Sequence, residues 1–83
     1  MTTTAQINQD SLSVRVGAVV AELINESGMS VFGVAHKTGI SRVALARRLS
    51  GAVPFTVGEL FAVLAELGDL RPSEVVRRAE EQR

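Results

Sequence analysis

The sequence contains no cysteine, which excludes disulfide bridges and thiolate metal sites. It also lacks an apolar run long enough to cross a bilayer, and its N-terminus lacks the basic and apolar blocks of a secretory signal. The absence of cysteine fits a reducing compartment. We therefore expect a soluble, intracellular protein.

Patterns that carry catalysis or bind metal are missing as well. The single histidine, His36, has no carboxylate near it in the sequence, and no set of His, Asp and Glu has the spacing of metal ligands. Glycines 28, 33 and 39 form neither a Walker nor a dinucleotide-binding pattern. We expect no enzymatic activity, no metal and no cofactor.

Acidic residues are absent between Glu26 and Glu59, although nine basic and nine acidic residues give the chain a formal net charge of zero. A neutral chain with one basic face can still follow a phosphate backbone. The window without acids holds a cluster of basic residues: His36, Lys37, Arg42, Arg47 and Arg48.

Eighty-three residues make one small domain, and the apolar residues recur at helical spacing with no strand signal. The pattern predicts an all-α fold. Residues 1–9, rich in Thr, Gln and Asn, are predicted to be a flexible tail before a domain that spans residues 10–83. The first helix is expected to begin at a cap, Asp10 or Ser11, and to end near Ser27, with Arg15 on its solvent side.

Four shorter helices are predicted after Gly28. Ser30 and Ser41 are placed to cap helices over Val31–Thr38 and Arg42–Ser50, which end at Gly39 and Gly51. Thr56 and Glu59 form a capping box at the start of a helix that ends at Leu67. Its expected buried stripe is Leu60, Phe61, Leu64 and Leu67. Pro72 opens a fifth helix.

The helix over Arg42–Ser50 is predicted to have two unlike faces. At 100° per residue, Ile40, Leu45 and Leu49 fall together and anchor the helix to the core. The opposite side carries small residues and arginine, with Arg42 in the first turn. A short helix of this kind fits the major groove of DNA. The residues of its outer side are Val43, Ala46, Arg47 and Ser50.

The order Ala35, Gly39, Ile40, Ser41, Leu45 closely resembles the phage repressor and Cro family of helix-turn-helix domains (lambda-repressor-like, XRE-type), and the resemblance runs from about Val16 to Ala79. It implies a compact five-helix domain whose second and third helices form the helix-turn-helix unit. It also implies a sequence-specific DNA-binding transcriptional regulator in the cytoplasm of a bacterial host cell, associated with the nucleoid.

Roles for individual residues follow from this resemblance and from charge. The base-reading residues are predicted to be Arg42, Val43, Ala46 and Arg47. The phosphate contacts are predicted to be Ser30, Lys37, Arg48 and Ser50. One departure stands out: the family commonly has a glutamine in the first turn of the second helix, where this chain has Val31 followed by Phe32. A polar contact is thereby removed, and two apolar side chains come near the expected DNA surface.

Members of the family bind near-palindromic operators as dimers, with half-sites about one helical turn apart. The resemblance therefore implies a homodimer on duplex DNA, and the small size favours a Cro-like or short immunity repressor. The same apolar side chains have an alternative use, which is to close the core of one chain. The predicted dimer residues are Val53, Phe55, Val75, Val76 and Ala79.

A second hypothesis is a protein-interaction module on the same fold, such as an antitoxin-like or anti-repressor subunit. It rests on the zero net charge and on Val31 and Phe32 in place of a polar pair. Salt separates the two hypotheses, because binding to phosphates weakens steeply as salt rises.

Overall fold

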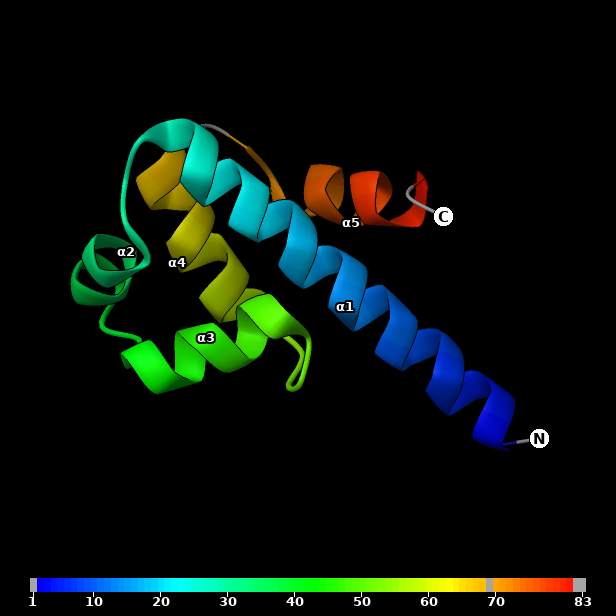
Figure 1. The fold of residues 1–83 in the computed structure, drawn as a ribbon. Coiled ribbons are helices and arrows are strands. Elements are labelled where there is room, and N and C mark those ends of the chain that lie inside the picture. The colour runs from blue at the N-terminus through cyan, green and yellow to red at the C-terminus, as the bar shows by residue number, and fades with distance from the viewer. Residues whose placement is uncertain (1, 69, 82–83) are drawn as a thin grey trace.

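A computed structural model describes the backbone of residues 2–68 and 70–81 and, within these ranges, the side chains from Leu12 on. The described residues form five α-helices and no strand, so the predicted all-α class is confirmed (Figure 1). The helices are α1 (Thr2–Ser27), α2 (Val31–Thr38), α3 (Arg42–Ser50), α4 (Val57–Leu67) and α5 (Pro72–Glu81).

The predicted start of the first helix is wrong, because α1 already begins at Thr2 and its N-terminal part projects beyond the other helices (Figure 1). The segment before Asp10, predicted as a tail, has a helical backbone. It contains no glycine or proline, and extending an existing helix adds one hydrogen bond for each residue that becomes ordered. A good capping residue is therefore not sufficient to start a helix.

The bounds of α2 and α3 agree with the sequence prediction, because local caps define both ends. The Ser30 and Ser41 hydroxyls accept hydrogen bonds from the backbone N–H groups of Gly33 and Ala44, at 3.0 and 3.1 Å. Both helices end at a glycine with a left-handed backbone, at φ 77° after α2 and φ 83° after α3. The predicted capping box of α4 is also present.

One residue of the predicted α4 stripe is misplaced. Phe61 is 58% exposed, whereas Val63 is completely buried. Leu60 lies 100° from Phe61 around the helix axis, but Val63 and Leu64 return to the same side as Leu60. The buried core consists of Val16, Val19, Val20, Leu23, Ile24, Val34, Ala35, Leu45, Leu60, Val63, Leu64, Val75 and Ala79.

α1 and α3 approach each other closely at Gly17. A Cβ atom at this position would meet the backbone carbonyl oxygens of Leu49 and Arg48, the latter at 2.6 Å. Both carbonyls belong to the last turn of α3. Only a residue without a side chain lets the two backbones come this near, so Gly17 sets the distance between α1 and α3.

α5 packs against α1 and α4. Arg15 does not lie on the solvent side as expected, because its Nε atom donates a 2.7 Å hydrogen bond to the carbonyl oxygen of Ala79 in the last part of α5. None of the described helices is by itself long and apolar enough to cross a membrane; α1 and α2 meet that test only as a joined pair, bent by 102°.

Gly17→Ala should destabilise the chain by about 1–3 kcal/mol, because the added methyl group pushes α1 away from the rigid backbone of α3. Urea denaturation followed by circular dichroism measures this change. Gly58→Ala is the matched control, since a Cβ atom at Gly58 has no neighbour within 4 Å. We expect that variant to be as stable as the parent or slightly more so. Equal stability of the two variants would contradict the assigned contact.

Candidate functional site

α2, the turn of residues 39–41 and α3 form one continuous unit, and one side of this unit packs against the hydrophobic core. Leu45 of α3 is completely buried, and Ile40 and Leu49 pack partly buried against the core. The Thr38 hydroxyl donates to the carbonyl oxygen of Val34 at 2.8 Å, so this side chain bonds back to its own helix at the end of α2. The predicted anchoring side of α3 is thus confirmed.

The opposite side of α3 points into solvent. Ser41, Arg42, Val43 and Ala46 border a single shallow depression over the first half of the helix. Val43 is 64% exposed although it is apolar, and α3 contains no acidic residue. The predicted outer residues are all exposed: Arg42, Val43, Ala46, Arg47 and Ser50.

Arg48 does not belong to this exposed side. Its Nε and Nη2 atoms donate to the two carboxylate oxygens of Glu59, each at 3.1 Å. Only 18% of the Arg48 side chain and 22% of the Glu59 side chain are exposed. The phosphate contact of Arg48 stays a prediction that this pairing disfavours, because Glu59 balances its charge and engages its Nε and Nη2 donors.

The Arg48–Glu59 pair fastens the end of α3 to the start of α4. Glu59 also accepts a hydrogen bond from the backbone N–H of Thr56 at 2.9 Å, within the capping box. The guanidinium of Arg48, and then the Thr56 N–H, hold the pKa of the Glu59 carboxyl below its ordinary value. The sequence predicts the capping box, but it does not predict that Arg48 binds the carboxylate of the same Glu59.

The other three predicted phosphate residues are exposed. Lys37 lies in the last turn of α2. Ser30 is engaged as the cap of α2, and the Ser50 hydroxyl donates to the carbonyl oxygen of Arg47 at 3.0 Å. These hydroxyl groups have a structural use already, and their contact with phosphate stays a prediction.

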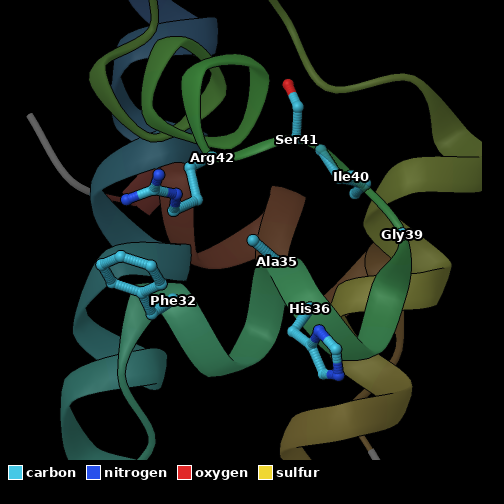
Figure 2. Close-up of a pocket in the computed structure, with 7 residues that line it drawn as sticks. All are labelled: Phe32, Ala35, His36, Gly39, Ile40, Ser41 and Arg42. Atoms are coloured by element: carbon cyan, nitrogen blue, oxygen red, sulfur yellow. The ribbon is translucent and has the colours of Figure 1, made fainter.

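Arg42 and Phe32 form a pair that the sequence did not indicate. The Cζ atom of Arg42 lies 4.0 Å from the centroid of the Phe32 ring (Figure 2). Phe32 is 63% exposed and Val31 is 38% exposed, so neither enters the core. Together with His36 and the turn, the pair borders a hollow of about 390 Å³ between α2 and the start of α3.

The predicted dimer residues divide into two groups. Val75 and Ala79 are completely buried, so they close the core of the chain and cannot contact a second copy. Phe55 and Val76 remain partly exposed and line one apolar hollow of about 210 Å³, together with residues of α1 and α4. Val53 is also partly exposed, in the loop between α3 and α4.

Within the part of the chain that the structure describes, no three His, Asp or Glu side chains lie close enough to hold a metal ion. No family model, no curated protein and no solved structure matches the chain.

Glu59→Gln tests the pair through pH. Because the folded chain lowers the pKa of Glu59 from its ordinary value of 4.5, the carboxylate stabilises the fold above this value. That contribution is lost as the pH falls through the lowered pKa. We expect the parent to be more stable than E59Q at pH 7, and the difference to shrink below pH 4.5 in urea denaturation series.

Glu66→Gln makes the same change at an exposed position of α4. It should leave the parent's pH dependence in place. A stability gap between E59Q and the parent that stays constant with pH would show that the charge of Glu59 does not matter.

Proposed function

We propose that this chain is a sequence-specific DNA-binding transcriptional regulator of the helix-turn-helix type, in which α2 and α3 form the unit and α3 reads the major groove. The resemblance to phage repressors and Cro proteins supports this proposal. Under this proposal the chain acts as a repressor by covering a promoter, in the manner of a Cro-like or short immunity repressor.

The observation that carries the proposal is that α3 has one buried, apolar side and one exposed side with arginines. Its buried side is locked by Leu45, and its solvent side presents Arg42, Val43, Ala46 and Arg47 without an acidic neighbour on the helix. Small side chains let a helix approach the base edges closely, and an arginine can donate two parallel hydrogen bonds to guanine. An α-helix fits the width of the major groove.

Few cations are available to one copy of the chain. With Arg48 paired to Glu59, the exposed basic residues of α2 and α3 are His36, Lys37, Arg42 and Arg47. Affinity for duplex DNA rises with the number of phosphates neutralised. A dimer on two half-sites therefore binds more tightly than one copy, because it makes twice as many phosphate contacts. The remaining dimer candidates from the predicted set are Phe55 and Val76, in their shared apolar hollow, and Val53 in the loop before α4.

The first test is binding to duplex fragments from the region around the chain's own gene, measured by fluorescence anisotropy with competitor DNA at several salt concentrations. We expect saturable binding to one fragment, with an association constant that falls linearly with salt on a log–log plot. Footprinting of that fragment then gives the half-site spacing. Binding that ignores salt, or no binding, would contradict the proposal.

Arg47→Ala should weaken binding to that fragment roughly 5- to 150-fold, which corresponds to the loss of about 1–3 kcal/mol of base recognition. Arg78→Ala is the matched control, because it removes an exposed arginine from α5, which packs on α1 and α4 away from α3 (Figure 1). Circular dichroism should show the same fold for both variants. Equal affinities of the two variants would remove α3 from the proposed interface.

A second candidate function is a protein-interaction module. The exposure of Val31, Phe32 and Val43 around the α2–α3 unit favours it, since apolar groups at a surface are typical of protein contacts. The salt series above separates the two candidates, because only the phosphate contacts of DNA binding require a steep dependence.

A further inference from the structure

We propose that Phe32 is a positioning residue for Arg42, holding its guanidinium over the aromatic ring so that the N–H donors point outward to a guanine. This inference rests on the proposed DNA-binding function and names one determinant of its specificity. Phe32 lies in the first turn of α2 and Arg42 is the first residue of α3.

The exposure of Phe32 needs an explanation that the core does not supply. The ring is 63% exposed, and its described contact is the guanidinium of Arg42, whose Cζ atom lies 4.0 Å from the ring centroid. A cation is attracted to the negative face of an aromatic ring at this distance. Figure 2 shows the two side chains next to each other beside the hollow, one from each helix.

Stacking restrains an arginine without consuming its hydrogen-bond donors. The five N–H groups of a guanidinium lie in its plane, whereas the ring engages its face. Arg48 illustrates the opposite case, because Glu59 accepts from its Nε and Nη2 atoms. Arg42 and Arg48 therefore differ in what remains available: within the described part of the chain nothing accepts from the edge of Arg42, whereas Glu59 accepts from the edge of Arg48.

The caps and the turn of the α2–α3 unit fix the positions of Phe32 and Arg42 relative to each other. Ser30 and Ser41 cap the helices on which the two residues stand, and the turn between the helices is tied by Gly39, whose N–H donates to the carbonyl oxygen of Ala35. An unrestrained arginine loses much rotamer freedom when it binds. A side chain already held in place loses less of it, which strengthens binding and sharpens selection of one base.

The experiment begins with a selection of duplex oligonucleotides from a random library by the full chain. The Arg42→Ala variant then identifies the base pair at which the preference disappears. We expect Phe32→Leu to weaken binding to the selected duplex roughly 2- to 5-fold and to reduce the preference at that same base pair. Phe32→Tyr keeps the aromatic face, so it should retain the affinity and the preference.

A double-mutant cycle separates positioning from direct contact. If Phe32 acts through Arg42, Phe32→Leu has no further effect in the Arg42→Ala background. Phe61→Leu is the matched control, because Phe61 is similarly exposed but lies on α4. In the free chain, NMR should show a ring-current shift of the Arg42 side-chain protons that Phe32→Leu abolishes.

The outcomes distinguish the role of Phe32 from DNA binding as a whole. A full Phe32→Leu effect in the Arg42→Ala background, or no ring-current shift in the parent, would overturn the positioning role and leave DNA binding in place. The same holds if Phe32→Tyr behaves like Phe32→Leu. Failure of the selection to enrich any sequence would overturn sequence-specific binding itself, and the role of Phe32 with it.

Discussion

α1 and α3 meet so closely at Gly17 that no side chain fits between them, and the placement of the α2–α3 unit depends on this contact. The carbonyl oxygens of Leu49 and Arg48 lie too close to the position of a Cβ atom at Gly17 for one to fit. Because the last turn of α3 is held against α1, the helix cannot rotate about its axis without losing the burial of Leu45. The exposure of the opposite side is thus a consequence of core packing.

The bounds of α2, α3 and α4 could be predicted from the sequence because their signals are local. A capping side chain bonds to a backbone group three residues away, and a glycine with positive φ ends the helix that precedes it. The start of α1 could not be predicted in this way. Nothing in residues 2–11 stops a helix, so α1 runs through the capping residues Asp10 and Ser11 without a break.

The candidate site could be predicted only as far as helical periodicity reaches. Helical periodicity places Val43 and Arg47 on the outer side of α3. It does not predict the partners of the other two arginines, which are Phe32 of α2 and Glu59 of α4. Glu59 is eleven positions from Arg48, and their pairing depends on how the loop after Gly51 folds back. The burial of Val75 and Ala79 likewise depends on the docking of α5 against α1, which no local pattern specifies.

Three arginines on one short helix are therefore not three equivalent charges. Glu59 neutralises Arg48 and turns it into a tie between α3 and α4, while Phe32 restrains Arg42 without neutralising it. Arg47 is exposed on the outer side. A carboxylate and an aromatic ring act differently because one engages the edge of a guanidinium and the other its face. The chemistry of the neighbours, more than the number of basic residues, decides which of them a ligand can use.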